Sequence, residues 1–378
     1  MAFDIPINRF NTYSQKWEKY RGRDVIPLWV ADMDFRSPPS VLDALHKYVD
    51  HGIFGYAVPP AELVDIILSR LERLYGWKIK PESIVWLPGL VPGINLCCRS
   101  AGRDGDSVIT TTPVYPPFLT APEYSRRNLI SVPMIEEEGL WLMDFDMIRD
   151  SITEDTKLFI LCNPHNPTGR VFRKDELLRL AEICEANNLI ICSDEIHCDL
   201  IMDNNLNHIP IASLDPEIAK RTITLMAPSK TYNLAGLGCS FAIIENQRLR
   251  KRFIQEKAGI LPDVTITGFV AALAAYRDGD EWLEELLEYL RKNHKLVLDT
   301  VREIPNLSMK PAEATYLAWI DARMIGVENP ALFFEKYGVG LSDGADFGKK
   351  GFVRLNFGCP LCTLEEALKR IKRALEKI

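Results

Sequence analysis

Five short apolar stretches of the sequence are each followed at once by residues that can do chemistry. A lysine there can form a Schiff base with a carbonyl compound, and a carboxylate can keep a pyridine nitrogen protonated, so that the ring accepts an electron pair. A glycine turn that opens a helix offers free N–H groups to a phosphate, and a tyrosine can stack on a ring. Together they predict a site for an anionic aromatic cofactor. The five segments are Asn163–Gly169 (amide), Ser193–Asp199 (carboxylate), Met226–Asn233 (lysine), Pro88–Gly93 (glycine turn) and Thr111–Tyr115 (aromatic).

The stretches themselves are typical of parallel strands that are covered on both faces. They are short, apolar and β-rich, and amphipathic helices such as Pro60–Tyr75 and Lys174–Asn187 alternate with them. This alternation predicts one doubly wound sheet, in which ligands bind beyond the carboxyl ends of the strands. The five segments are therefore expected to meet at one rim. The expected strands are Ile84–Leu87, Ser107–Thr110, Leu158–Cys162, Leu189–Cys192, Thr222–Leu225 and Ser240–Ile244.

The last quarter of the chain has a different pattern. Asp280–Arg302 is a long helical stretch, Tyr316–Ile320 and Phe352–Asn356 are strand-like, and Thr363–Glu366 has the pattern of a capping box that opens a final helix. These features predict a second, smaller α+β domain that the N-terminal segment joins. The expected division is residues 1–45 as an N-terminal segment packing with the small domain, 46–280 as the large α/β domain, and 281–378 as the small domain.

Composition excludes several classes of protein. The 378 residues are 47% hydrophobic and 26% charged. The charges sum to −7 and lie in clusters of mixed sign, so the chain has no basic face for nucleic acid. The longest apolar run, Phe269–Tyr276, has eight residues, whereas a membrane span needs about 20. The N-terminus has no secretory pattern, and nine irregularly placed cysteines, including Cys359 and Cys362, fit reduced thiols. We therefore expect a cytoplasmic protein with no nucleic-acid or membrane partner.

Three motifs in order and spacing resemble those of fold-type I pyridoxal-phosphate (PLP) enzymes of the class I/II aminotransferase family. They are Asn163-Pro-His-Asn-Pro-Thr-Gly169, Ser193-Asp-Glu and Ser229-Lys-Thr. The resemblance covers essentially the whole chain and implies the large, doubly wound, mostly parallel sheet domain and smaller α+β domain of that architecture. Further motifs resemble the MalY/PatB-type cystathionine β-lyase (C–S lyase) subgroup, namely Leu28–Phe35, Gly52–Tyr56, Asp194–His197 and Val353–Gly358.

The resemblance implies a role for each residue around the cofactor ring. Lys230 would hold PLP as a Schiff base and then carry the Cα proton, and Asp194 would pair with the pyridine nitrogen. Asn166 would bond the phenolic oxygen of the ring, and Tyr115 would stack on it. His197 stands where many aminotransferases have a tyrosine that reaches the same oxygen, and histidine there suits the β-lyase subgroup.

The resemblance also implies how the phosphate and the substrate are bound. Tyr56 would reach the phosphate of a neighbouring subunit, which requires a homodimer, and Arg354 would bind the substrate α-carboxylate through two parallel hydrogen bonds. Many aminotransferases carry a phosphate-binding arginine eight residues after the lysine, but this chain has Gly238. We therefore expect phosphate binding to depend more on backbone groups and on Tyr56. The remaining implied phosphate contacts are the backbone of Gly89, Leu90 and Val91 and the hydroxyl of Ser229. The segment Ala31–Phe35 would line the substrate side.

Other interpretations of these residues remain open at the level of sequence. Arg354 has an alternative as a solvated strand residue, and Tyr56 as a core residue. Asp194, Glu195, His197 and Asp199 have side chains that can bind a metal ion. A metal site there would leave the lysine, the amide and the glycine turn without a role, so we expect no metal. A dinucleotide fingerprint fails because Phe241 replaces its third glycine. A DNA-binding regulator lacks room, because the residues before Ile84 include a helix and aromatic residues that the catalytic body needs.

The expected activity is that of a PLP-dependent C–S β-lyase acting on a small amino acid. Such an enzyme cleaves cystathionine or a related L-cysteine S-conjugate by α,β-elimination to a thiol, pyruvate and ammonia. The alternative is a class I/II aminotransferase, which shares every step through removal of the Cα proton. The sequence alone does not distinguish the two outcomes.

Overall fold

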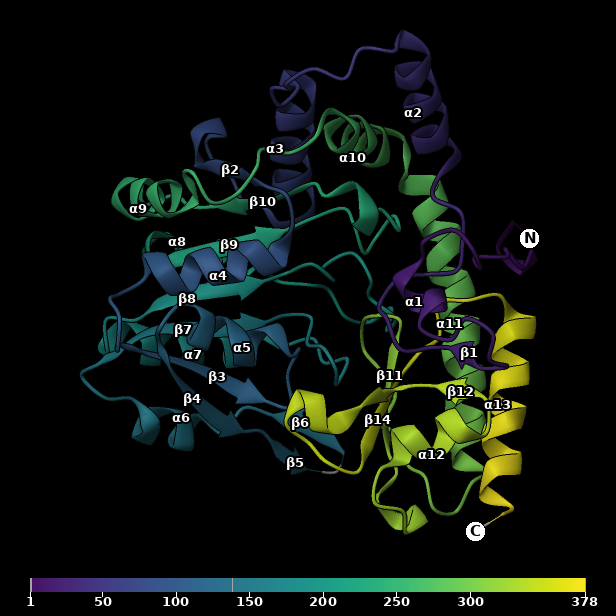
Figure 1. Cartoon of the computed structure of the whole chain (residues 1–378). Helices are drawn as coiled ribbons and strands as arrows, with labels where there is room; N and C mark the ends of the chain where they lie inside the picture. The colour runs from purple at the N-terminus through teal and green to yellow at the C-terminus, as the bar shows by residue number, and fades with distance from the viewer. Residues whose placement is uncertain (1, 138, 378) are drawn as a thin grey trace.

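The computed structural model describes residues 2–137 and 139–377, and its larger body is built on a seven-stranded sheet (Figure 1). Every neighbouring pair is parallel except the two pairs made by β10, which is antiparallel to both neighbours. All six expected strands form. The seventh, β4, is an edge strand with mostly exposed side chains, so it lacks the apolar run that marked the others. The strand order is β2 (Ile84–Leu87), β10 (Ser240–Ile243), β9 (Thr222–Met226), β8 (Ile190–Asp194), β7 (Thr156–Cys162), β3 (Ser107–Thr112) and β4 (Asn128–Pro133).

Helices cover both faces of this sheet, which explains the continuous apolar strands. On β7, Leu158 and Ile160 pack with the helices of one face, whereas Phe159 and Leu161 pack with those of the other. This alternation follows from the two-residue period of a strand. One face carries α4 (Leu90–Ser100), α5 (Pro117–Tyr124) and α9 (Gln247–Lys257); the other carries α6 (Phe145–Ser151), α7 (Lys174–Ala186) and α8 (Pro216–Lys220). Helices α3 (Ala61–Tyr75) and α10 (Ile266–Asp278) lie at the β2–β10 edge, and α2 (Pro39–His51) packs against α10.

A smaller body lies beside the carboxyl ends of the parallel strands (Figure 1). Its sheet places β14 (Phe352–Asn356) between β11 (Leu317–Asp321) and β13 (Ser342–Asp343), with Trp319 and Ser342 opposite Arg354. The N-terminal segment attaches here, because β1 (Ile26–Pro27) pairs in parallel with β12 (Val339–Gly340). The domain boundaries after residues 45 and 280 stay predictions. The helices of this part are α1 (Gln15–Glu18), α11 (Asp280–Arg302), α12 (Pro330–Lys336) and α13 (Leu361–Leu375).

The start of the final helix differs from the expected capping box. Helix α13 begins at Leu361 with Pro360 as its N-cap, and no side chain caps it. Thr363 therefore lies inside the first turn, because the proline already sets the backbone for helix entry. A small hairpin, β5 (Ile135–Glu137) with β6 (Leu140–Leu142), and short 3-10 turns complete the fold. Those turns are Ala2–Asp4, Pro81–Ser83, Ile211–Ser213, Ala235–Leu237, Arg323–Ile325 and Gly344–Phe347.

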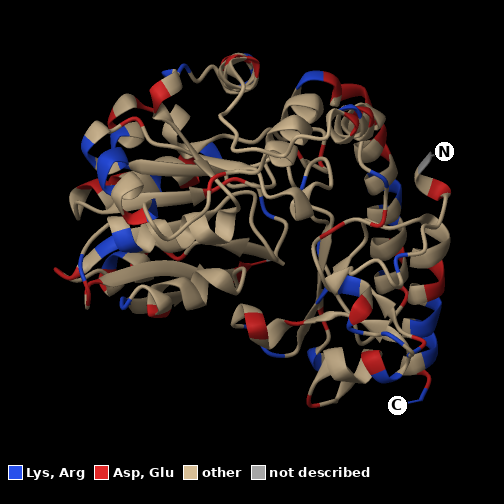
Figure 2. Ribbon diagram, turned by 45° about the horizontal axis from the view of Figure 1, so that its top comes forward, with Lys and Arg blue, Asp and Glu red and all other residues tan. Residues whose placement is uncertain are grey.

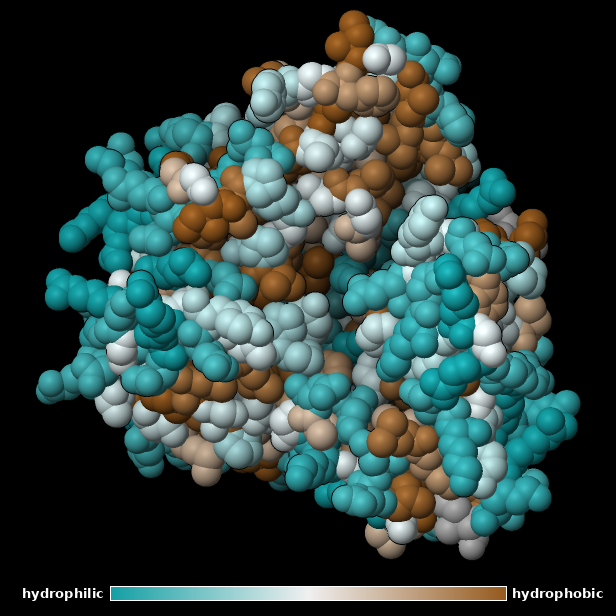
Figure 3. All heavy atoms as spheres, viewed as in Figure 1, coloured by the Kyte–Doolittle hydropathy of each residue, from teal (hydrophilic) through white to brown (hydrophobic). Residues whose placement is uncertain are grey.

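Charge and hydropathy agree with a mixed surface. Basic and acidic residues alternate along the outer helices of both bodies (Figure 2). Within the described ranges, no helix combines the length and apolar character needed to cross a membrane. Apolar side chains gather at the top of the molecule over α2 and the segment that follows it (Figure 3). The exposed ones in this region are Val49, Ile53, Phe54, Tyr56 and Val58.

Candidate active site

A cavity of about 640 Å³ opens between the carboxyl ends of the parallel strands and the smaller body. Figure 3 shows the surface hollowed between the two bodies. All but one of the predicted site residues line this cavity, and Tyr56 is the exception. The lining residues from that set are Gly89, Leu90, Val91, Tyr115, Asn166, Asp194, His197, Ser229, Lys230 and Arg354.

Lys230 lies four residues after β9 and points into the cavity. Its Nζ donates to the carbonyl oxygen of Ala31 at 2.5 Å. Burial lowers the pKa of Lys230 to about 8, although the negative charges of Asp32 and Asp194 oppose that shift. A substantial share of the amine is therefore neutral near pH 8, which is the form that attacks a carbonyl carbon.

Asp194 is the last residue of β8 and is buried at the floor of the cavity. Burial raises the pKa of Asp194 to about 7, with the nearby Glu195 adding to the increase and the N–H of Ile196 opposing it. Across the described residues, Asp194 takes part in none of the ion pairs. A buried carboxylate without a cation fits a ligand that brings a protonated nitrogen.

Asn166 and His197 add polar groups on the same side of the cavity. The Asn166 Oδ1 accepts a hydrogen bond from Arg354 Nη1 at 2.9 Å. His197 is buried and its ring meets that of Tyr316 edge-on. Its Nδ1 has no hydrogen-bond partner among the residues that the structure describes. Burial lowers the pKa of His197 to about 3, so the ring is neutral. An unpaired nitrogen on a buried ring is a polar group that a bound ligand can satisfy.

The predicted phosphate contacts lie at the start of α4. Gly89 is its N-cap, and Leu90 and Val91 are its first helical residues, so their N–H groups lack partners within the helix. Gly238 abuts this turn with φ of 60°, and a Cβ there would lie 3.0 Å from the carbonyl oxygen of Pro88. Glycine at this position therefore lets the chain pass close to the turn, and the cavity wall beside it is backbone rather than an arginine side chain.

Arg354 projects from β14 into the cavity from the opposite side. Its Nη2 donates to the carbonyl oxygen of Trp29 at 2.8 Å and to Ser342 Oγ at 3.3 Å. Its Nε is buried without a partner, and burial lowers the pKa of Arg354 to about 10. Among the described residues, no carboxylate forms an ion pair with it. The guanidinium is thus a buried cation for which an anionic ligand would supply the missing charge.

Tyr56 is fully exposed and lies outside the cavity of its own chain. It belongs to a stretch between α2 and α3 that is neither helix nor strand. Because its side chain is exposed, it is not a core residue. Its role toward a neighbouring subunit stays a prediction. The expected roles of the other site residues likewise stay predictions, although the structure brings those residues together.

The alternative metal set does not converge in the structure. Glu195 is engaged by Ser193 at 2.9 Å and by His208 at 2.7 Å, and Asp199 is paired with Arg70 at 2.6 Å. In the ranges that the structure describes, no group of three or more His, Cys, Asp or Glu side chains is placed to hold a metal ion.

The family resemblance already implies that the segment Ala31–Phe35 lies on the substrate side, and Ala31 does line the cavity. Sequence reasoning missed the particular contacts made there. Trp29 and Ala31 supply carbonyl oxygens to Arg354 and Lys230, and the hydroxyl of Tyr316 donates to the Ala31 carbonyl at 2.9 Å. The motif around Trp29 was recognised, but backbone carbonyls leave no signal in a sequence. Tyr316 carried a signal as the polar first residue of an expected strand.

Comparisons with known proteins identify the family and support the fold. The model of the family described as aminotransferase class I and II matches residues 23–371. Cystathionine beta-lyase PatB of Bacillus subtilis is 38% identical, over 99% of this chain and all of that protein. The crystal structure of OvoB superimposes with a TM-score of 0.97 at 47% identity, covering 99% of both chains. That of the PLP-bound C–S lyase from Staphylococcus hominis gives 0.93 at 34%, again with 99% of both chains.

Proposed function

This chain belongs to the aminotransferase class I and II family, and within that family we propose that it is a PLP-dependent C–S β-lyase. Its substrate is cystathionine or a related L-cysteine S-conjugate. The observation that carries the proposal is the cavity that holds Lys230, Asp194 and Arg354, in a chain similar over its full length to proteins named as C–S lyases. The balanced reaction takes an S-conjugate and water to a thiol, pyruvate and ammonia.

The cofactor fits the residues that face the cavity. PLP supplies an aldehyde for a lysine amine and a ring that accepts the electron pair from the substrate Cα. Lys230 would hold that aldehyde, and Asp194 would pair with the protonated ring nitrogen. Asn166 and His197 would hold the phenolic oxygen, and Tyr115, which lines the cavity, would stack on the ring.

The start of α4 would hold the phosphate end of the cofactor. The N–H groups of Gly89, Leu90 and Val91 would donate to it, and the partial positive charge of the helix N-terminus would add to the attraction. Ser229 adds its hydroxyl from the turn before Lys230. These contacts take the place of the arginine that is absent at Gly238.

Two residues then act on the substrate. Arg354 binds the α-carboxylate, which provides the negative charge that its buried guanidinium lacks. The Lys230 amine would accept the proton from the substrate Cα. With a pKa of about 8, this amine is a base suited to a near-neutral reaction.

A second copy of the chain completes the site. Tyr56 reaches the phosphate of the partner, and the apolar side chains around it are buried in the dimer. Exposed residues such as Ile53, Phe54 and Val58 support this interface, because an apolar patch of this kind is typical of a contact between proteins. The enzyme works in the cytoplasm, where its nine free thiols stay reduced.

The experiment that tests the activity is incubation of the PLP-loaded protein with cystathionine and no added 2-oxo acid. We expect continuous release of pyruvate and a free thiol. An aminotransferase would instead stop after one turnover and resume only when a 2-oxo acid is supplied. The Lys230→Ala variant is the control and should lose both the activity and the visible absorbance of the lysine-bound cofactor. Absence of pyruvate and thiol in the parent protein would rule out the lyase.

A further inference from the structure

The segment Trp29–Phe35 crosses the cavity wall without helix or strand hydrogen bonds of its own. Side chains from distant parts of the chain satisfy most of its backbone groups instead, and the N–H of Asp34 donates to the carbonyl of Gly358. The position of the segment therefore depends mainly on these side chains. Five successive carbonyl oxygens accept hydrogen bonds from side chains. The donors are Arg354 and Ser342 to Trp29, Asn356 to Val30, Lys230 and Tyr316 to Ala31, Asn356 and Lys16 to Asp32, and Asn233 and Arg9 to Met33.

Two of these carbonyls touch the groups on which the proposed reaction depends. The Ala31 oxygen accepts from Lys230 Nζ at 2.5 Å, and the Trp29 oxygen accepts from Arg354 Nη2 at 2.8 Å. The position of this segment therefore sets where the amine and the guanidinium rest.

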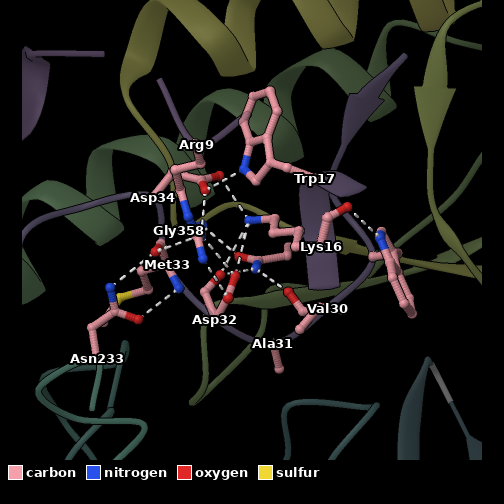
Figure 4. Close-up of polar contacts among 12 residues, drawn as sticks. Arg9, Lys16, Trp17, Val30, Ala31, Asp32, Met33, Asp34, Asn233 and Gly358 are labelled. Carbon is pink, nitrogen blue, oxygen red and sulfur yellow. Dashed lines mark hydrogen bonds and ion pairs between the residues drawn. The ribbon is translucent and has the colours of Figure 1, made fainter. Parts of the chain in front are cut away.

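A buried cluster of charges lies immediately behind the segment, and Figure 4 shows its donors converging on two carboxylates. Asp34 accepts from Lys16 at 2.7 Å, from Arg9 at 2.7 Å and from the indole N–H of Trp17 at 2.9 Å. Asp32 accepts from Arg9 at 2.9 Å. We call Arg9, Lys16, Asp32 and Asp34 the N-terminal charge cluster.

The charges of the cluster cancel, with two cations and two anions, and its centre is shielded from solvent. Lys16 is fully buried and Asp34 nearly so. Burial by itself would raise the pKa of Asp34, but Lys16, Trp17 and Arg9 lower it below its usual value. Removal of one partner would leave a buried charge unpaired, which is far more costly than breaking an exposed ion pair.

The cluster also acts on Lys230 through charge. Among the charged neighbours of Lys230, Asp32 changes its pKa most and raises it, ahead of Arg354 and Asp194. A cluster that served only to attach the N-terminus would not need a carboxylate beside the reacting amine.

We propose that Lys16, together with Arg9 and Trp17, is a positioning residue that holds the segment Trp29–Phe35 against Lys230 and Arg354. These side chains act through Asp32 and Asp34, which flank Met33 in the sequence. This inference rests on the proposed function only for the roles of Lys230 and Arg354. The mechanical part, the hold on the segment, is independent of it.

The test is amide hydrogen exchange of the cofactor-free protein, followed by kcat measurement after PLP is added. The N–H of Met33 donates to Asn233 Oδ1 at 3.0 Å, and that of Asp34 donates to the Gly358 carbonyl at 2.8 Å. In Lys16→Met we expect both amides to exchange about tenfold faster or more, because a hydrogen-bonded charge is lost. We expect kcat to fall by a similar factor.

Two further variants make the result decisive. Trp17→Phe removes one donor to Asp34 and keeps the ring, so it should show smaller changes in the same direction and decides the question if Lys16→Met does not fold. Arg127→Met removes another buried cation, at the amino end of β4 away from the cavity. It should lower the unfolding temperature without accelerating exchange at Met33 or Asp34.

Three results would overturn the proposal. They are exchange at these two amides equal to that of the parent, acceleration spread equally over β14 and the rest of the chain, and faster local exchange with kcat unchanged. If the parent protein has no lyase activity, the proposed function fails, and the exchange data still decide whether the cluster holds the segment.

Discussion

Replacing Asp194 with asparagine should stabilise the cofactor-free protein while destroying its activity. Burial raises the pKa of this carboxyl from 3.8 to about 7, so folding penalises the ionised form. The unfolded chain loses the proton near pH 4 and the folded chain near pH 7, so the penalty grows between these values and is constant above them. A shift of about three units corresponds to about 4 kcal/mol at most, at 1.36 kcal/mol per unit. The asparagine Oδ1 can keep the hydrogen bond from the Ile196 N–H.

Urea unfolding of cofactor-free parent and Asp194→Asn between pH 5 and 9 measures this effect. The variant should gain stability over the parent as the pH rises, up to a plateau above pH 7, and the difference should shrink toward pH 4. Asp150→Asn, at an exposed position, is the matched control and should show no such trend. PLP should then stabilise the parent more than the variant, because only the carboxylate can pair with a protonated ring nitrogen. A variant that is no more stable than the parent at pH 8 would refute the argument that this carboxyl is held in an unfavourable state.

Two other substitutions separate substrate binding from cofactor binding. Arg354→Ala should raise the KM for cystathionine about 30-fold or more, since loss of a buried charged contact costs about 2 kcal/mol or more, while bound PLP is retained; loss of PLP during dialysis would contradict the carboxylate role. Tyr56→Phe should weaken PLP retention about tenfold or more and leave the dimer intact by light scattering, since only a hydrogen bond to a charged group is removed; an unchanged PLP affinity would show that this hydroxyl does not reach the phosphate.

Much of the fold could be predicted because burial on both faces leaves a strong signal. Strands such as β7, apolar from Leu158 to Cys162, were found within one or two residues, and α11 was found at its observed bounds. The edge strand β4 escaped because one of its faces meets solvent. The start of α13 was misplaced because a Thr-x-x-Glu pattern competed with Pro360, and fixed proline geometry decided the outcome.

The candidate site divides along a similar line. Residues that act through side chains at strand ends, such as Lys230 and Asp194, could be predicted because the topology of a parallel sheet brings strand ends together. The roles of Trp29 and Ala31 could not, because each acts through a carbonyl oxygen that every residue possesses. The burial of Lys16 was equally hidden, since a lysine near the N-terminus is ordinarily exposed.

The pKa shifts of the charged groups differ between the cavity and the cluster behind it. Lys230 and Arg354 have pKa values lowered by burial, and Asp194 has one raised by burial, so burial disfavours the charged form of all three. In contrast, Asp34 is stabilised as an anion by partners that the chain itself supplies. The three charged groups whose burial is not offset by partners among the described residues face the cavity. Asp34, whose charge is offset by such partners, lies behind the cavity wall. A ligand with a protonated ring nitrogen, an aldehyde and, with the substrate, a carboxylate would relieve each of the three in turn. Binding energy is then concentrated where the reaction occurs. When no ligand is bound, the N-terminal charge cluster keeps the cavity wall that carries Ala31 in place.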